Sequence, residues 1–263
     1  MSFLAQRSII RTATLFLTAS WIIGCGDDGS STDTTGIEVI VANGGLNTTE
    51  TGGTASFVIR LLAAPSADVM VPLSSSDETE GLVTPAELTF TIDDWSAPQM
   101  VTATGVDDDI QDGTVVYLAQ LGAAMSSDEN YSGLDAEDVS IENIDDETAG
   151  ITVSPTSGLT TTEGGGSDTF SIVLNSQPQT DTEVIVAVSS SNPAEGTAVP
   201  TSVTFTDENW DSPQVVTVTG QDDGEADGNV VYSIETAPAE SGDSNYTGLD
   251  AADVEVTNTT RTM

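Results

Sequence analysis

The stretch Phe170-Ser171-Ile172-Val173-Leu174 places three large apolar side chains at every second position. Alternation with a period of two is typical of a β-strand that is buried on one face. The same period recurs further along the chain, at Val184, Val186, Val188, Val203 and Phe205. Clusters of Gly, Pro, Asn, Asp and Ser separate these runs, and no stretch keeps a helical period over a helix-like length. The sequence therefore predicts an all-β chain.

The segment from Gly36 to Asn143 is repeated from Gly150 to Asn258. The register is fixed by matching residues: Glu50 with Glu163, Phe57 with Phe170, Trp95 with Trp210, Tyr117 with Tyr232, and Tyr131 with Tyr246. Each copy of about 110 residues has the usual size of an independent domain. Several short strands with regular turn signals are typical of an immunoglobulin-like β-sandwich of about seven strands. We therefore expect two tandem β-sandwiches, over residues 36–147 and 150–258.

The composition is strongly acidic, with 43 Asp and Glu against 4 Lys and Arg, no His, and a formal net charge of -39. Such a field repels phosphate backbones and anionic membrane surfaces, so the charge disfavours nucleic acid as a partner and makes cations the natural counterions. Paired carboxylates alone can hydrolyse glycosides. However, both copies carry similar acids, no aromatic-lined cleft is evident, and a chain without His or Lys has no nucleophile–base pair. The sequence predicts a protein that is not an enzyme.

Residues 1–24 have the pattern of a secretory signal peptide. Arg7 and Arg11 supply its positive region, and the apolar run from Thr12 to Ile23 is too short to span a membrane. The segment ends at Ile22-Ile23-Gly24-Cys25, which resembles the lipobox of bacterial lipoproteins, and Cys25 is the only cysteine in the chain. The resemblance implies that Cys25 is lipidated and becomes the new N-terminus. The alternative is an ordinary signal peptide with an unrelated thiol.

Residues 25–35 consist mainly of Gly, Ser, Thr and Asp, which have nothing to bury, and this composition indicates a flexible tether. Gly26 follows the cysteine where an aspartate would favour retention in the inner membrane of many Gram-negative bacteria. We therefore expect a chain that is anchored by lipid at the outer membrane or cell surface and is otherwise soluble.

Acidic residues gather in corresponding loops of the two copies. The first loop contains Asp107, Asp108, Asp109 and Asp112, and the second contains Asp222, Asp223, Glu225 and Asp227. Carboxylates at this density repel one another unless a cation or water offsets their charge. A dense set of hard oxygen ligands suits Ca²⁺, whereas Zn²⁺ prefers His or Cys. The loops therefore indicate candidate calcium sites.

Three motifs in order give the repeated unit a resemblance to the Calx-beta family, the β-sandwich modules of sodium/calcium exchangers and of many bacterial surface proteins. They are a Thr-Glu-x-Gly-Gly turn at Glu50 and Glu163, the acidic loop, and the run Asn143-Ile144-Asp145-Asp146-Glu147 that closes the first copy. In calcium-binding members of that family these motifs converge at one end of the sandwich and hold several Ca²⁺ ions.

The resemblance implies a ligand set in each copy. In the first copy it comprises Glu50, Asp107, Asp108, Asp109, Asp112, Asp145, Asp146 and Glu147. In the second it comprises Glu163, Asp222, Asp223, Glu225 and Asp227, because Thr259-Thr260-Arg261-Thr262-Met263 stands where the acidic run should be. Glu80 and Glu195 lie near a further aspartate of the family, but the aromatic usually beside it is missing. We expect calcium binding in the second copy to be weaker or absent.

These observations favour a non-catalytic, lipid-anchored surface protein whose tandem domains bind calcium and serve as a rigid spacer or adhesion module. One alternative is a carbohydrate- or matrix-binding surface lipoprotein that stacks sugars on Trp95 and Trp210. A Trp repeated at a strand edge is more often a packing residue, and the same holds for Tyr131 and Tyr246. Another alternative is that the carboxylates are solvated turn residues or an adaptation to salt.

Overall fold

The computed structural model describes residues 35–42, 44–225 and 227–260. The predicted signal peptide, Cys25 and the tether up to residue 34 lie outside these residues, as does Arg261. Within the described ranges, no helix is long and apolar enough to cross a membrane. The chain divides into two compact units: the first contains the described residues up to Asp108 together with Asp112–Asp146, and the second contains Asp109–Gln111 and the residues from Glu147 onward.

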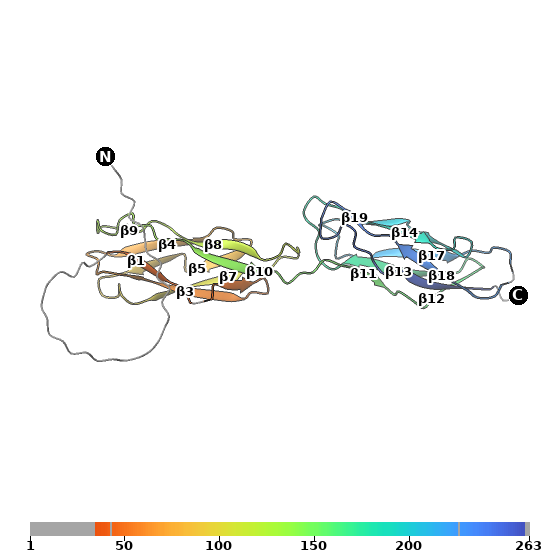
Figure 1. Ribbon diagram of the computed structural model, residues 1–263, viewed down its shortest axis with the longest axis horizontal. Coiled ribbons are helices and arrows are strands. Elements are labelled where there is room, and N and C mark those ends of the chain that lie inside the picture. The colour runs from red at the N-terminus through yellow and green to blue at the C-terminus, as the bar shows by residue number, and fades with distance from the viewer. Residues whose placement is uncertain (1–34, 43, 226, 261–263) are drawn as a thin grey trace, which may run out of the picture. The chain divides into compact units, whose positions relative to one another are not determined.

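The first unit has two β-sheets (Figure 1). One sheet has the strand order β1-β3-β7-β5, and the other has the order β2-β10-β8-β4-β6, with β9 beside β4. The strands are β1 (Ile37–Ile40), β2 (Asn47–Thr49), β3 (Thr54–Leu61), β4 (Val69–Ser75), β5 (Gly81–Thr84), β6 (Glu87–Phe90), β7 (Gln99–Gly105), β8 (Val115–Leu121), β9 (Met125–Ser126) and β10 (Val139–Ile144).

The second unit repeats this topology, with the sheet orders β11-β13-β17-β15 and β12-β20-β18-β14-β16 and with β19 beside β14. Its strands are β11 (Ile151–Ser154), β12 (Leu159–Thr162), β13 (Ser167–Leu174), β14 (Val184–Ser190), β15 (Gly196–Val199), β16 (Ser202–Phe205), β17 (Gln214–Gly220), β18 (Val230–Thr236), β19 (Glu240–Ser241) and β20 (Val254–Thr259). The prediction of an all-β chain with two sandwiches is confirmed. Among the described residues each unit has ten strands instead of about seven; the division of its first strand and the short strand beside β4 or β14 account for two of the additional strands.

The first strand of each unit is divided between the two sheets. In the first unit β1 pairs antiparallel with β3, whereas β2 pairs parallel with β10. Gly44 and Gly45 lie between these strands with φ of 116° and 84°, a region that glycine adopts at little cost. The division brings the residue after β2 to the end of β10, where the Glu50 N–H donates to the Ile144 carbonyl oxygen at 3.1 Å. Residues distant in sequence therefore meet at this end of the sandwich.

The core of each unit consists of the inward-facing side chains of its strands. In β13, Phe170, Ile172 and Leu174 have exposed fractions of 2%, 0% and 3%, as the alternation in the sequence predicts. In β3 the equivalent positions Phe57, Ile59 and Leu61 are buried in the same way. Burying one such side chain contributes about 1.5–3 kcal/mol to the free energy of unfolding.

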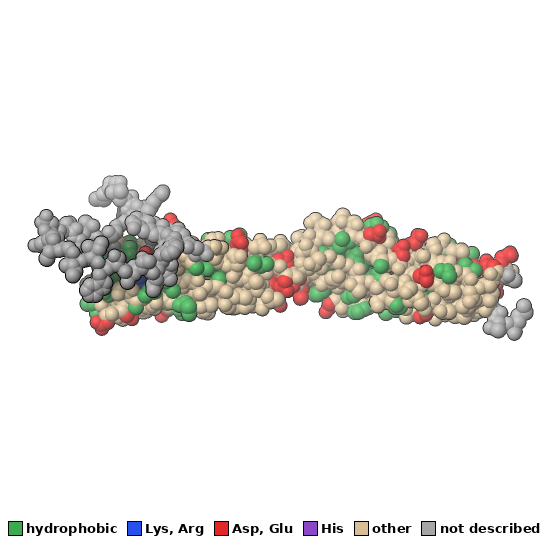
Figure 2. Space-filling model, turned by 60° about the horizontal axis from the view of Figure 1, so that its bottom comes forward, with side chains coloured by type: hydrophobic (Ala, Val, Ile, Leu, Met, Phe, Trp, Pro, Cys, Tyr) green, Lys and Arg blue, Asp and Glu red, His purple; other side chains and the backbone are tan. Residues whose placement is uncertain are grey.

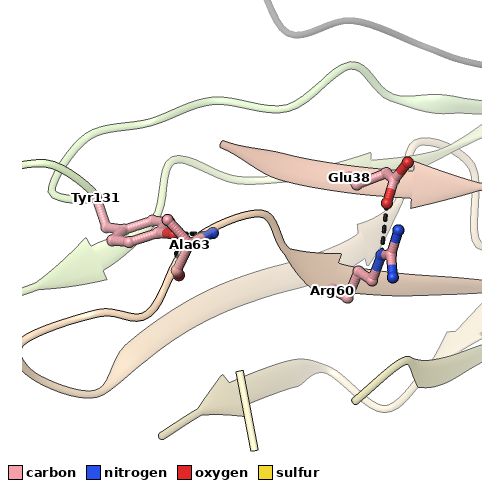
Figure 3. A network of polar contacts seen from close by, with 4 residues as sticks. All are labelled: Glu38, Arg60, Ala63 and Tyr131. Atoms are coloured by element: carbon pink, nitrogen blue, oxygen red, sulfur yellow. Dashed lines mark hydrogen bonds and ion pairs between the residues drawn. The ribbon is translucent and has the colours of Figure 1, made fainter. Parts of the chain in front are cut away.

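Two polar contacts of the first unit appear in Figure 3. Arg60 on β3 forms an ion pair with Glu38 on β1, and Arg60 is the only Lys or Arg among the described residues. This pair is partly exposed and contributes at most about 1 kcal/mol. The second contact is buried: the Tyr131 hydroxyl donates to the Ala63 carbonyl oxygen at 2.5 Å and accepts from the Ala63 N–H at 3.2 Å. The Tyr131 side chain therefore joins its own turn to the loop after β3.

Replacing Tyr131 with Phe is expected to lower the free energy of unfolding of the first unit by about 1–3 kcal/mol, because two buried backbone groups of Ala63 lose their partner. Urea denaturation followed by intrinsic fluorescence measures this change. Tyr117→Phe is the matched control, because within the described part of the chain the Tyr117 hydroxyl has one long contact, of 3.3 Å, with the Thr48 hydroxyl. Equal losses in both variants would contradict the role assigned to Tyr131.

Candidate metal centre

Three carboxylates of the first unit face one another at the end of the sandwich. Glu80 lies immediately before β5 and is 7% exposed, while Asp108 and Asp112 come from the loop between β7 and β8. Each of the three offers an oxygen within 4.8 Å of the oxygens of the other two. A backbone hydrogen bond joins the segment before β5 to the start of the loop after β7: the Val106 N–H donates to the Glu80 carbonyl oxygen at 3.0 Å. We call this set the first cluster.

The equivalent residues of the second unit form the same arrangement, which we call the second cluster: Glu195, Asp223 and Asp227. Glu195 lies before β15 and is 4% exposed, and the other two come from the loop between β17 and β18. The Gln221 N–H donates to the Glu195 carbonyl oxygen at 2.9 Å, as Val106 does to Glu80. Two copies of the sequence have thus diverged elsewhere while keeping one buried and two more exposed carboxylates together.

Further carboxylate pairs lie beside the first cluster. Oxygens of Glu50 and Asp145 lie within 4.8 Å of each other, and so do oxygens of Asp107 and Asp146. Glu50 is 2% exposed, and Asp145 accepts a hydrogen bond from the Gly113 N–H at 2.5 Å. The first unit therefore gathers acids from the turn after β2, the loop after β7 and the segment after β10. Two other acids predicted as ligands in the first copy, Asp109 and Glu147, belong to the second unit.

The remaining acids predicted in the second copy are placed differently. The Asp222 carboxylate accepts from the Gly224 N–H at 3.0 Å within its own turn, and Glu225 is exposed. The Glu163 N–H donates to the Thr259 carbonyl oxygen at 3.1 Å, the equivalent of the bond from Glu50 to Ile144. The next residue, Thr260, stands where the first copy has Asp145. The second unit consequently lacks the Glu50–Asp145 pair and keeps one cluster.

In the first unit, two kinds of carboxylate can be distinguished by their partners. Asp128 accepts backbone N–H groups of Ser66 at 2.7 Å and Asn130 at 2.9 Å, and these bonds lower its pKa. Hydrogen bonds from Thr79 and Thr91 likewise lower the pKa of Asp77 and Asp94, respectively. These acids organise turns, and they fit the alternative in which carboxylates are solvated turn residues.

Asp112 has the opposite electrostatic environment. Loss of solvation and then the negative charges of Glu80, Asp108 and Asp145 raise its pKa to about 6. Its side chain still has an exposed surface, so water also reaches it. No Lys or Arg of the described residues is available nearby, since Arg60 pairs with Glu38, and acidic side chains appear on the visible face of both units in Figure 2. A cation at the first cluster would remove this repulsion.

The donor set fits a hard divalent cation. Ca²⁺ binds oxygens at about 2.3–2.6 Å, so two oxygens on one ion lie no more than about 5 Å apart. The separations within 4.8 Å satisfy this limit in both clusters. Neither cluster offers nitrogen or sulfur, which Zn²⁺ prefers. The chemistry of both clusters therefore suits calcium.

Glu80 and Glu195 are the residues whose place sequence reasoning underestimated. They were connected only with an aspartate of the Calx-beta family, yet each is the most buried member of its cluster. Both directly precede a glycine that opens a strand, Gly81 or Gly196, and they occupy matching positions of the repeat. The sequence signal that pointed to them is the glutamate repeated before a glycine at matching positions, whereas their burial is visible only in the structure.

Replacing Asp112 with Asn is expected to raise the melting temperature of the metal-free protein at pH 8. The raised pKa means that ionisation of Asp112 costs the folded state stability, and this cost grows between about pH 4 and pH 6 and is complete above the folded pKa. The variant should therefore gain stability in EDTA at pH 8 and gain little near pH 4.5. Calorimetric melting at the two pH values checks this, and Asp93→Asn, an exposed acid outside the clusters, is the control for the loss of one charge.

Trp95 and Trp210 are partly buried and pack against the cores of their units. Their carbonyl oxygens accept from the N–H groups of Leu61 at 2.9 Å and Leu174 at 3.1 Å. Tyr131 and Tyr246 are almost fully buried. These placements give all four aromatics a packing role and provide no support for the sugar-stacking alternative.

This chain is similar in structure to several solved proteins. No family model and no curated protein matches the chain. The crystal structure of CBD12 from CALX1.2 is 12% identical and covers 83% of this chain and 97% of its own, with a TM-score of 0.38. The calcium binding domain CBD12 of CALX1.1 is 16% identical, covering 75% and 78%, with a TM-score of 0.37. Domains 4 and 5 of the S-layer protein SbsC are 13% identical, covering 73% and 77%, with a TM-score of 0.30. Similarity at this level assigns no function to the chain.

Proposed function

We propose that this chain is a non-catalytic calcium-binding protein in which the first cluster is a metal site. The observation that carries the proposal is that Glu80, Asp108 and Asp112, which come from two separate segments, hold oxygens within 4.8 Å of one another. The Glu50–Asp145 and Asp107–Asp146 pairs supply further oxygens beside the cluster. Six to eight oxygens complete a calcium shell, so carbonyl groups and water would contribute the remainder.

The second cluster is the corresponding site of the second unit. It has Glu195, Asp223 and Asp227, but Thr260 stands where the first unit has Asp145. Because calcium affinity rises with the number of charged ligands, the second site binds calcium more weakly than the first.

The setting of these sites is proposed from the sequence. The signal-peptide pattern of residues 1–24 and the lipobox-like sequence before Cys25 support a bacterial lipoprotein at the outer membrane or cell surface. Tandem sandwiches that are stabilised by calcium suit a rigid spacer or adhesion module that presents a surface to a protein or glycan ligand. Ligand binding to the native state alone raises stability, so calcium outside the cell would keep both units folded.

Isothermal titration calorimetry with CaCl₂ tests the calcium proposal on EDTA-treated protein. The wild type should bind calcium, and Glu80→Gln combined with Asp108→Asn should remove the tighter class of sites. Glu137→Gln combined with Asp93→Asn changes the charge equally at exposed positions outside the clusters and should bind as the wild type does. A flat titration of the wild type at millimolar calcium would reject the proposal and leave the acids as solvated turn residues.

A further inference from the structure

A fully buried asparagine occupies the same place in both units. Asn143 lies on β10 and Asn258 on β20, with exposed fractions of 0% and 1%. The other inward-facing residues of β10 are Val139 and Ile141, so an amide replaces an apolar side chain near the end of a core strand. Burying an amide costs free energy unless its groups are hydrogen-bonded. The hydrogen-bond partners of this amide therefore indicate its role.

The amide of Asn143 joins the two segments that carry the first cluster. Its Nδ2 donates to the Glu80 carboxylate at 3.3 Å and to the Val106 carbonyl oxygen at 3.1 Å. Its Oδ1 accepts from the Thr48 hydroxyl at 2.9 Å. A carboxylate and a carbonyl oxygen can only accept, so the nitrogen must face Glu80 and Val106. One side chain thus holds Glu80 and the residue immediately before the acidic loop.

The same contacts recur in the second unit. Nδ2 of Asn258 donates to the Glu195 carboxylate at 3.0 Å and to the Gln221 carbonyl oxygen at 3.0 Å. Its Oδ1 accepts from the Thr161 hydroxyl at 3.0 Å. The amide therefore has the same three kinds of partner in both units, although Gln221 stands where the first unit has Val106.

We propose that Asn143 and Asn258 are positioning residues of the two metal sites, holding the buried glutamate of each cluster in place before the ion arrives. This inference rests on the proposed calcium function. Without such a partner, carboxylates that repel one another would have to be brought together when calcium binds, and this costs free energy. A partner that orders them during folding lowers the free-energy cost of binding. The Nδ2–H group of the asparagine offsets part of the negative charge of the glutamate and fixes the orientation of its carboxylate. Loss of such an outer partner lowers metal affinity by about 10- to 100-fold.

Calcium calorimetry on the full chain tests the role of Asn143. Asp223→Asn and Asp227→Asn together form the background, so that the titration reports the first unit alone. Asn143→Leu in this background removes the amide at similar size and should weaken calcium binding by about 10- to 100-fold. Thr48→Val is the matched control, because it also loses a buried hydrogen bond but leaves the contacts of Nδ2 with Glu80 and Val106. Its affinity should stay within about threefold of the background, since a purely structural loss lowers stability and leaves a folded site intact.

Each outcome decides between distinct conclusions. A folded Asn143→Leu protein that binds calcium like the background overturns the positioning role, and so does an equal loss of affinity in Thr48→Val. A background protein that binds no calcium rejects the proposed function instead. If Asn143→Leu does not fold, Asn258→Leu in an Asp108→Asn, Asp112→Asn background makes the same test in the second unit. If both stay unfolded in millimolar calcium, the amides are structural and the inference is rejected.

Discussion

Gly105→Ala is expected to destabilise the first unit by about 3 kcal/mol, near the upper end of what overpacking a well-packed site costs. A Cβ at Gly105 would lie 2.2 Å from the Thr49 carbonyl oxygen and 2.5 Å from the Asn143 Oδ1. The first of these atoms belongs to the backbone and cannot rotate away. The substitution would therefore separate the turn after β2 from the end of β7, where the acidic loop begins.

Chemical denaturation of the two variants Gly105→Ala and Gly122→Ala measures this effect. Gly122 is the matched control, because a Cβ there would meet Pro72 at 3.4 Å, an ordinary van der Waals contact, and its φ is not positive. Gly220→Ala should repeat the loss in the second unit, where a Cβ would lie 2.3 Å from the Thr162 carbonyl oxygen. Equal stability of Gly105→Ala and Gly122→Ala would contradict the close approach at Gly105.

Calcium at 100 times its dissociation constant is expected to raise the melting temperature of the first unit by about 10 °C. Binding to the native state alone contributes about 2.7 kcal/mol per site at this concentration, and 1 kcal/mol moves the melting temperature of a domain of this size by about 4 °C. Differential scanning calorimetry in CaCl₂ and in EDTA measures the shift. Asp108→Asn combined with Asp112→Asn should lose most of it.

The control for this experiment is a matched salt. MgCl₂ at the same concentration screens surface charge equally, but Mg²⁺ requires a near-octahedral shell and gives up its water reluctantly. A thermal shift that MgCl₂ reproduces in full would assign the stabilisation to general screening of the acidic surface. That outcome would favour the alternative in which the acidic residues are an adaptation to salt.

Much of the fold could be predicted from local sequence. The alternation at Phe170–Leu174 appears in the structure as the inward face of β13, and the repeat predicts that the first unit has an equivalent strand, β3. The division of the first strand could not be predicted in this way. It depends on the parallel pairing of β2 with β10, whose residues Asn47 and Glu142 are far apart in the chain. Such pairing leaves no local periodic signal, so the strand number was underestimated.

The candidate site was predictable to the extent that its acids are neighbours in sequence. Asp108 and Asp112 share one loop, and the density of carboxylates there is visible without a structure. Glu80 is different, because its buried carboxylate accepts a hydrogen bond from Asn143 on β10, a strand that lies far from it in the chain. A glutamate before a glycine looks like an ordinary turn residue. Only the folded sandwich shows that it faces two aspartates.

The predicted ligands Asp109, Glu147, Glu163, Asp222 and Glu225 stay predictions, drawn from the acidic loops and from the Calx-beta resemblance. Asp222 shows that an acid of such a loop also has a local backbone partner. Its carboxylate caps its own turn by accepting from the Gly224 N–H, a local bond typical of Asp in loops. An acidic loop therefore supplies both turn-forming and outward-facing carboxylates, and spacing does not separate them.

A crystal structure of the full chain grown in CaCl₂ would show whether the first cluster binds calcium. We expect an ion in the first unit bound at about 2.3–2.6 Å by oxygens of Glu80, Asp108 and Asp112. Anomalous scattering from a lanthanide exchanged into the same position would identify it as a metal. Carboxylates of the first cluster that remain bound only to water in saturating calcium, or an ion that does not contact Glu80, would contradict calcium binding at the first cluster.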